Sequence, residues 1–271
     1  MNDKVVLITG ASSGMGRETA LQLAKDGYKV YGAARRKEKL TGLEGVAAIE
    51  MDISNEDSIV SGVQEILERA GHIDILINNA GYGEYGPIEN IPLKDARYQL
   101  EVNLFGAARL IQLVLPKMRA NKWGKIFNIT SIGGKLALPF GGWYHASKFA
   151  MEGLSDALRN EVRPFGIDVI VIEPGAIETE WGGIAVNNMM KYAEGTEYAE
   201  IINKMKNGLE GAINEASEPA VIADAIRDIL KEAKPKARYN VGAHSDEMLA
   251  ARKNMTDEEF DLAMAKIMLG D

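Results

Sequence analysis

A tyrosine and a lysine four residues apart, Tyr144 and Lys148, are the side chains whose spacing most suggests chemistry. Residues four apart lie on one face of a helix, so the phenol and the ammonium would project the same way. A nearby ammonium favours the phenolate and lowers a phenol pKa that is ordinarily about 10, which suits proton transfer near neutral pH. Exposed helices also produce this spacing by chance, so the pattern needs support from elsewhere in the chain.

A glycine-rich loop near the N-terminus gives such support. Gly10, Gly14 and Gly16 follow the apolar run 5–8 and precede a segment whose apolar residues recur at helical spacing. Glycines permit a tight turn and a close approach of the backbone to a pyrophosphate, and the N-terminus of a helix attracts negative charge. The order of strand, loop and helix therefore favours dinucleotide binding over a flexible turn.

The elements that must position these residues alternate between strands and helices. Apolar runs predict strands over 5–8, 28–33, 46–50, 73–77, 125–130, 167–172 and 238–241. Helical periodicity predicts a helix from the glycine loop to Gly27 and further helices over 55–71, 93–120, 143–164, 218–234 and 257–269. The alternation predicts an α/β protein with a doubly wound parallel sheet of about seven strands, helices on both faces, and a single domain over residues 1–271.

Residues at the ends of the predicted strands would share one edge of the sheet. Thr9, Asn78, Ser131 and Pro174 each stand at such an end. In open α/β sheets the ligand binds in the crevice outside the carboxyl ends of the strands. We therefore expect the glycine loop, Ser131 and the helix of Tyr144 to face one crevice.

The alternation lapses in the last third of the chain. Residues 181–217 are rich in Gly, Asn and Met and show no strand pattern, which predicts an irregular substrate lid. Within it, residues 182–210 are expected to be the most mobile internal segment. Methionine adapts to irregular apolar surfaces, so at least one of Met189, Met190 and Met205 is a candidate to face the substrate.

Composition narrows the class of protein. The 271 residues are 46% hydrophobic and carry a net charge of −8, which argues against nucleic-acid binding. The chain has no cysteine, which excludes disulfides and thiol nucleophiles, and His72, His145 and His244 lack the spacing of metal ligands, so no metal is expected. No apolar run could span a membrane, and an apolar strand begins too early for a signal peptide. We expect a cytoplasmic protein, with His145 in a packing or surface role.

Taken together, these motifs resemble the short-chain dehydrogenase/reductase family in its shorter, single-domain, Rossmann-type form. The resemblance rests on the loop 9–16, the run Asn-Asn-Ala-Gly at 78–81, Asp52, and the segment 174–179 with its Pro-Gly pair. These motifs span residues 9–179 in the order and spacing of the family.

Four catalytic positions follow from the resemblance: Asn103, Ser131, Tyr144 and Lys148. Tyr144 would exchange a proton with the substrate oxygen, and Ser131 would donate a hydrogen bond to that oxygen. Lys148 would lower the phenol pKa and bind the nicotinamide ribose, and Asn103 would hold a water molecule that links Lys148 to solvent. The residues implied in cofactor binding are Gly10, Ser12, Ser13, Gly14, Met15, Gly16, Arg35, Arg36, Asp52, Ile53, Asn79, Ala80, Gly81, Tyr144, Lys148, Pro174, Gly175, Ile177 and Thr179.

The end of the second predicted strand indicates NADP(H) as the cofactor. Ala34 stands where NAD-dependent members of the family carry an aspartate that accepts hydrogen bonds from the ribose 2′-hydroxyl. Arg35 and Arg36 follow, and arginine matches a phosphate with forked, charge-assisted donors. Arg17, just after the glycine loop, is either a further donor to this phosphate or a surface residue.

The implied function is an NADP(H)-dependent oxidoreductase that interconverts a ketone or aldehyde with its alcohol, acting on a hydrophobic carbonyl compound. The run 238–242 resembles the last strand of family members that act on hydroxysteroids or retinoids, whereas the tail 244–271 matches no motif. One alternative is a catalytically silent NADP(H)-binding regulator or redox sensor, which would not need the four catalytic residues. Another is an epimerase or dehydratase, whose relatives usually carry a distinct substrate domain.

The predicted helix over 93–120 indicates an oligomer. Its middle, from Leu100 to Leu115, has almost no polar face. A helix that is apolar all round must be covered on both sides, by the sheet on one side and by a second subunit on the other. The family resemblance also implies assembly, so we expect a homodimer or homotetramer.

Overall fold

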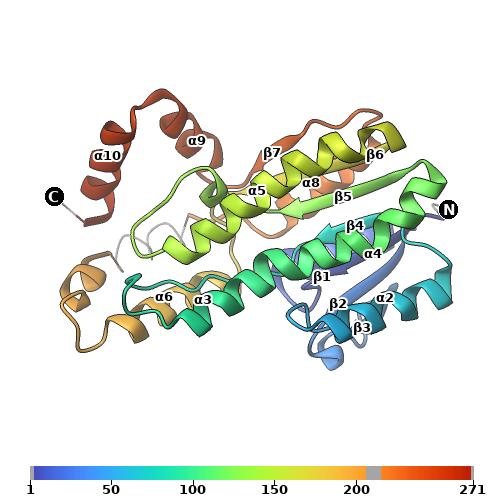
Figure 1. The fold of residues 1–271 in the computed structure, drawn as a ribbon, viewed down its shortest axis with the longest axis horizontal. Helices are drawn as coiled ribbons and strands as arrows, with labels where there is room; N and C mark the ends of the chain where they lie inside the picture. Colours follow the sequence, from blue (N-terminus) through green and yellow to red (C-terminus); the bar gives the residue numbers. More distant parts are fainter. Residues whose placement is uncertain (1–2, 206–214, 270–271) are drawn as a thin grey trace.

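The computed structural model describes residues 3–205 and 215–269, which contain one parallel sheet (Figure 1). Within these residues seven strands lie in the order β3-β2-β1-β4-β5-β6-β7, and every neighbouring pair is parallel. The strands are β1 (Val5–Thr9), β2 (Lys29–Ala34), β3 (Val46–Glu50), β4 (Ile75–Asn78), β5 (Gly124–Ile129), β6 (Ile167–Pro174) and β7 (Arg238–Val241). The predicted α/β class and the seven strands are confirmed.

Helices cover both faces of this sheet (Figure 1). They are α1 (Gly14–Lys25), α2 (Glu56–Ala70), α3 (Leu93–Leu100), α4 (Gly106–Asn121), α5 (Gly142–Val162), α6 (Glu180–Ala193), α8 (Ala220–Lys231), α9 (Ser245–Asn254) and α10 (Asp257–Leu269). The shorter helical turns are η1 (Lys37–Lys39), η2 (Glu101–Phe105), η3 (Ile132–Gly134) and η4 (Arg163–Phe165). Among the described residues, no helix is long and apolar enough to cross a lipid bilayer.

Side chains alternate across β1 and divide the core into two layers. Val5 and Leu7 belong to the cluster formed with α2, α4 and α5, whereas Val6 and Ile8 belong to the cluster formed with α1 and α8. Because helices cover both faces, every residue of β1 is buried, as is usual for a central parallel strand. The strand order reverses between β1 and β4, and sheets of this kind bind ligands at such a switch point.

The long helix predicted over 93–120 forms with an interruption. The π-helical turn Glu101–Phe105 separates α3 from α4. Turns of this kind occur frequently at functional sites, and this one carries Asn103. Gly106 is required at the junction, because a Cβ atom there would lie 2.1 Å from the carbonyl oxygen of Ile53.

The prediction of an irregular segment over 181–217 is wrong for much of its length. Residues Glu180–Ala193 form α6, and residues 199–205 are helical as well. Residues 206–214, a further part of the predicted lid, lie outside the described residues. The expected mobility of this region stays a prediction.

The helix α6 forms because its N-terminus is capped and one face is buried. Thr179 accepts a 3.3 Å hydrogen bond from the backbone N–H of Trp181. Ala185, Met189 and Ala193 recur every four residues and are buried on one side of the helix. Burial of this apolar stripe outweighs the low helix propensity of the glycines near its start.

The C-terminal tail packs over the end of the sheet. It contains α10, as predicted, and also α9, which the sequence pattern did not indicate. Phe260 and Met264 of α10 are buried against Leu136, in the loop between β5 and α5. Figure 1 shows α9 and α10 at the same end of the molecule as α6, beyond the tip of the β5 arrow.

Candidate active site

Tyr144 and Lys148 lie one turn apart on α5, and both side chains are buried. The Nζ atom of Lys148 lies 5.8 Å from the centroid of the Tyr144 ring, so the structure brings the predicted pair together. The same ammonium donates a 2.9 Å hydrogen bond to the carbonyl oxygen of Ile129, the last residue of β5. The lysine is thereby held beside the phenol at the carboxyl edge of the sheet.

Burial dominates the ionisation of both groups. It raises the pKa of Tyr144 to about 12, while a hydrogen bond with the Ser131 side chain acts in the opposite direction. It lowers the pKa of Lys148 to about 8, although the charge of Glu152 favours the ammonium. Burial therefore leaves the phenol pKa above its ordinary value in this structure, and the expected lowering of that pKa by the ammonium stays a prediction.

Ser131 follows β5 and begins the turn η3. Its Oγ atom accepts a 3.0 Å hydrogen bond from the backbone N–H of Gly133. A Cβ atom on Gly133 would lie 3.1 Å from the ring of Tyr144, so this turn packs directly against the phenol. Ser131, Tyr144 and Lys148 line one cavity, at the edge of the sheet where the sequence places them.

Asn103 is held rigidly by the backbone of the loop after β4. Its side-chain amide donates 3.0 Å hydrogen bonds to the carbonyl oxygen of Tyr82 and to the hydroxyl of Ser147. Its Oδ1 atom accepts a 3.1 Å hydrogen bond from the N–H of Tyr82. A Cβ atom on Gly81 would lie 3.2 Å from this Oδ1 and 3.6 Å from Nζ of Lys148, so both side chains converge on one glycine.

His145, next to Tyr144, holds the loop between β5 and α5. Its Nε2 atom accepts a 3.0 Å hydrogen bond from the N–H of Leu138, and its Nδ1 atom lies 2.9 Å from the carbonyl oxygen of Gly133. One ring nitrogen accepting and the other donating is the pattern of a neutral imidazole, and burial lowers the pKa of this histidine. Of the packing and surface roles expected for His145, the structure shows the packing role, and the buried ring also lines the cavity described below.

The glycine loop is shaped to admit a ligand close to its backbone. Gly10 and Gly14 have φ values of +68° and +52°, which favour glycine. A Cβ atom on Gly16 would lie 2.4 Å from the side-chain nitrogen of Asn79, which itself donates a 2.9 Å hydrogen bond to the carbonyl oxygen of Thr9. No side chain caps α1, because the hydroxyl of its N-cap residue accepts no hydrogen bond from the helix. The first N–H groups of α1 thus suit a pyrophosphate.

The end of β2 carries no carboxylate. Ala34 is buried there, and the exposed arginines Arg35 and Arg36 follow it. The Nη1 atom of Arg35 donates a 3.0 Å hydrogen bond to the hydroxyl of Tyr98, on α3. Asp52, after β3, accepts hydrogen bonds from the N–H and the hydroxyl of Ser54 at 2.9 and 2.7 Å. The end of β2 therefore presents two exposed guanidinium groups, which can bind an anion.

A buried carboxylate cluster lies one turn further along α5 than the lysine. Glu152 accepts a 2.6 Å hydrogen bond from the hydroxyl of Thr130 and forms ion pairs of 3.0 and 2.9 Å with Lys135 and Arg238. Glu173 of β6 lies beside it, and burial together with the charge of Glu152 raises the pKa of Glu173 to about 7. The cluster ties the loop that contains Ser131 to α5, β6 and β7.

The candidate residues border a cavity of about 320 Å³. The predicted residues that line it are Met15, Asn79, Gly81, Ser131, Tyr144, Lys148, Pro174, Gly175, Ile177 and Thr179. The predicted residues outside its lining are Gly10, Ser12, Ser13, Gly14, Gly16, Arg35, Arg36, Asp52, Ile53, Ala80 and Asn103. Within residues 3–205 and 215–269, no group of three or more His, Asp or Glu side chains could hold a metal ion.

Other walls of the cavity come from residues that the motifs did not indicate. The rings of Tyr85 and Trp181 have their centroids 5.5 and 5.1 Å from that of Tyr144. Met248, Met264 and Ile267 reach the cavity from α9 and α10. Of the candidate methionines, Met189 and Met205 line the cavity. The spacing 181, 185, 189 was a signal for the wall on α6, but no motif marked the tail.

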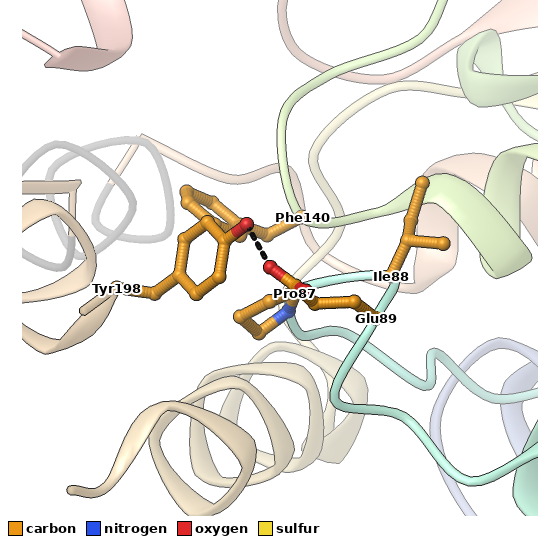
Figure 2. Close-up of a pocket in the computed structure, with 5 residues that line it drawn as sticks. All are labelled: Pro87, Ile88, Glu89, Phe140 and Tyr198. Atoms are coloured by element: carbon orange, nitrogen blue, oxygen red, sulfur yellow. Dashed lines mark hydrogen bonds between the residues drawn. The ribbon is translucent and has the colours of Figure 1, made fainter. Parts of the chain in front are cut away.

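A shallow depression lies on the surface beside this site (Figure 2). There the hydroxyl of Tyr198 donates a hydrogen bond to Glu89, and its ring meets that of Phe140 edge-on at a centroid distance of 6.0 Å. Pro87 and Ile88 complete the depression. The contacts tie the segment after α6 to the loops before α3 and α5, and so brace one wall of the cavity.

Similar proteins extend over nearly the whole chain. A family model described as short chain dehydrogenase matches residues 4–188. A probable short-chain type dehydrogenase/reductase of Helicobacter pylori is 34% identical over 98% of this chain and 98% of its own. The 3-ketodihydrosphingosine reductase of Bacteroides thetaiotaomicron is 36% identical over 94% of this chain and 93% of its own. The NADPH-dependent 3-dehydrocapnine reductase of Ornithobacterium rhinotracheale is 33% identical over 95% of both.

Solved structures share the same architecture. A short-chain dehydrogenase from Streptomyces avermitilis has a TM-score of 0.82 and 32% identity, over 98% of this chain and 96% of that chain. An alcohol dehydrogenase from Thermococcus sibiricus complexed with 5-hydroxy-NADP has a TM-score of 0.75 and 26% identity, over 90% of this chain and 98% of that chain. A 3-ketoacyl-(acyl-carrier-protein) reductase from Brucella melitensis complexed with NADH has a TM-score of 0.71 and 27% identity, over 88% of this chain and 96% of that chain. Both nicotinamide cofactors thus occur among the similar structures.

Proposed function

The chain belongs to the short-chain dehydrogenase/reductase family, and we propose that it is an NADP(H)-dependent oxidoreductase that interconverts a ketone or aldehyde with the corresponding alcohol. One observation carries the proposal: the hydroxyls of Ser131 and Tyr144 and the ammonium of Lys148 meet at one end of a cavity whose remaining walls are largely apolar. This end offers a proton donor and a hydrogen-bond donor to a carbonyl oxygen, and the apolar walls suit a hydrophobic carbonyl compound.

The cofactor would lie along the carboxyl edge of the sheet, where it supplies the hydride chemistry when bound. The N–H groups of the glycine loop and of α1 would hold its pyrophosphate. Asp52 and Ile53 would border the adenine, and Arg35 and Arg36 would bind the 2′-phosphate. The segment from Pro174 to Thr179 would hold the nicotinamide end, with Lys148 at its ribose.

Tyr144 would move the proton. Its raised pKa keeps the phenol protonated near neutral pH, so it can donate to the alkoxide that develops from a ketone. Ser131 would hydrogen-bond the same oxygen, and Lys148 would stabilise the phenolate that forms. Asn103, held close to Lys148, would position a water that returns the proton from solvent. In the oxidative direction the phenolate accepts the proton, so that direction gains as the pH rises.

The choice of NADP(H) over NAD(H) rests on the end of β2. Ala34 lacks the carboxylate that would accept from a ribose hydroxyl and repel a phosphate, and two exposed arginines follow it. The relatives support the same choice, since one is named as NADPH-dependent and one structure holds an NADP derivative. Two relatives are also named for the reduction of a ketone, 3-ketodihydrosphingosine and 3-dehydrocapnine.

A panel assay tests this function. Oxidation of NADPH is followed with ketones, aldehydes, quinones and steroids, and reduction of NADP⁺ with the matching alcohols. We expect turnover of at least one hydrophobic carbonyl compound, with NADPH preferred over NADH. A Tyr144→Phe variant that binds NADPH without turnover is the control. Cofactor binding without turnover of any compound by the wild type would favour the silent regulator instead.

We also propose that the protein is a cytoplasmic homodimer or homotetramer. Phe105 of η2 and Phe149 of α5 are 52% and 46% exposed, although both are aromatic and lie on the helices next to the site. Exposed apolar side chains of this size on adjacent helices suit a contact with a second copy. Light scattering of the wild type and of a Phe105→Asp variant tests this, and a monomeric wild type would contradict it.

A further inference from the structure

The substrate end of the cavity is apolar on several sides. Beyond the residues proposed to hold the cofactor, it is formed by the loop between β5 and α5, by α6, and by the tail helices α9 and α10. Among the described residues of that lining, the charged or titratable side chains other than Tyr144 and Lys148 are Tyr85, His145 and His244. Both ring nitrogens of His145 form hydrogen bonds with backbone groups, and the Nε2 atom of His244 lies 3.1 Å from a carboxylate oxygen of Glu215. Most of this lining is therefore hydrocarbon, which suits an uncharged, apolar part of a ligand.

One wall is a stripe along α6. Trp181, Ala185 and Met189 recur every four residues and line the cavity. The stripe begins beside the phenol, because the Trp181 ring lies 5.1 Å from that of Tyr144. Eight residues of helix advance about 12 Å, so the stripe can follow a chain of atoms away from the reacting carbon.

The C-terminal tail supplies another wall. Met248 of α9 and Met264 and Ile267 of α10 line the cavity. Met264 is also packed with Phe260 against Leu136, on the loop that begins at Ser131. The tail is therefore part of the site, although no motif in it indicates a function.

The shape of these walls favours a slim, flexible chain over a rigid ring system. The volume of about 320 Å³ is near the lower end for small-molecule sites, and part of it belongs to the nicotinamide end. Methionine side chains are unbranched and adapt to a flexible ligand. Four of them line the substrate end of the cavity: Met189, Met205, Met248 and Met264.

We propose that the substrate is a ketone with an unbranched alkyl chain, and that α9 and α10 form the wall that determines its chain length. The carbonyl lies at Ser131 and Tyr144, and the chain runs along the α6 stripe toward Met264. This inference rests on the proposed function, because it names the substrate class of the same site. Met264 is a specificity-determining residue, since it borders the chain and not the reacting atoms.

The first test compares methyl ketones whose second substituent is ethyl, hexyl or decyl, with NADPH as the reductant. Each methylene buried should raise kcat/KM about three- to fourfold, until the chain fills the cavity. Thermal stabilisation of the protein by each ketone, with cofactor present, measures binding without turnover. Turnover of the ethyl ketone with no gain from longer chains, in rate or in stabilisation, would overturn the inference and leave the proposed function intact. Longer chains that stabilise the protein without any turnover would contradict the proposed function alone.

The second test places bulk in the cavity. Met264→Trp should shorten the chain that fits, and loss of about two buried methylenes lowers kcat/KM for the decyl ketone about tenfold. The loss should be much smaller for the ethyl ketone, whose short chain leaves the far end of the cavity empty, so the ratio of the two kcat/KM values is the readout. Leu262→Trp is the matched control, because Leu262 lies on the outer side of α10 and is 72% exposed. An equal effect of Met264→Trp on all ketones would contradict the inference. Met264→Ala, which enlarges the cavity, should move the optimum to longer chains and serves if the tryptophan variant fails to fold.

Discussion

The two ends of the cavity are built by different means. The cofactor end depends on the glycine loop and on residues that directly follow β1, β4 and β6, so the end of a strand places each of them. The substrate end depends on helices that meet only by packing, as when Phe260 and Met264 cover Leu136. Substitutions at the cofactor end should therefore remove one defined contact, whereas substitutions at the substrate end should shift selectivity by degrees.

Tyr144→Phe should have the largest effect, because it lies where the two ends meet. The variant keeps the ring and its contacts with Tyr85 and Trp181, and it removes only the proton donor. We expect turnover to fall at least about 10²-fold with every carbonyl compound, the usual scale for a general acid, while NADPH binding is kept. Steady-state kinetics measure the turnover, and NADPH fluorescence measures the binding of the cofactor. Near-normal turnover would rule out this phenol as the acid.

Arg35→Ala should act on the cofactor end alone. A hydrogen bond between charged groups contributes about 1.5–3 kcal/mol, so the wild type should prefer NADPH over NADH by roughly 10²-fold in kcat/KM, and the variant should lose most of this preference. The preference should shrink at high salt, because Arg35 is exposed.

The control is Lys37→Ala, which removes a nearby exposed charge and should leave the preference unchanged. The profile of substrates should be the same in both variants. An Arg35→Ala enzyme that still prefers NADPH as strongly would show that the end of β2 does not bind the 2′-phosphate.

Tyr98→Phe sharpens the same comparison with a smaller effect. Its hydroxyl accepts a 3.0 Å hydrogen bond from Arg35 and so orients the guanidinium. Loss of one exposed hydrogen bond should lower the preference for NADPH about threefold. Combining Tyr98→Phe with Arg35→Ala should add nothing, because the tyrosine acts through the arginine. Additive losses would mean that Tyr98 contacts the cofactor itself.

Glu173→Gln should have the smallest effect, and it should change the stability of the protein but not its selectivity for cofactor or substrate. Burial and Glu152 raise the pKa of Glu173 from 4.5 to about 7, so the folded protein binds this proton more tightly than the unfolded chain does. The stabilisation is present below the unfolded pKa and is lost as the pH rises through about 7. The variant cannot ionise, so its Tm should exceed that of the wild type by a few degrees at about pH 8 and by less at about pH 5.

Differential scanning calorimetry at the two pH values measures this difference. Glu178→Gln, at an exposed position further along the same segment, should show none. A Tm gain of Glu173→Gln that is equal at both pH values would mean that the carboxyl group does not titrate between them.

Much of the fold, and the common location of Ser131, Tyr144 and Lys148, could be predicted from the sequence. The apolar runs predicted the strands with nearly their observed bounds, and the alternation predicted a parallel sheet with helices on both faces. The spacing of Tyr144 and Lys148 and the position of Ser131 after β5 predicted a shared location, which the structure confirms. These predictions succeed because each depends on local geometry and on the side of a parallel sheet where strands end.

The remaining features could not be predicted because they depend on what covers a surface. The glycines of α6 suggested an irregular segment, yet burial of Ala185, Met189 and Ala193 makes it a helix. The methionine-containing tail carried no motif, yet it forms a wall of the cavity. The contact of Arg35 with Tyr98 joins residues from β2 and α3 that no local pattern relates.

The sequence by itself therefore determined the sheet, the edge at which the polar residues gather, and the pairing of phenol and ammonium on one helix face. Periodicity and strand order suffice for these, because they depend on the backbone. Only the tertiary structure decided that the pKa of Tyr144 is raised to about 12, since burial sets the cost of charging the phenol. It also decided which helices form the substrate end, because a sequence shows which face is apolar and packing alone shows what that face meets.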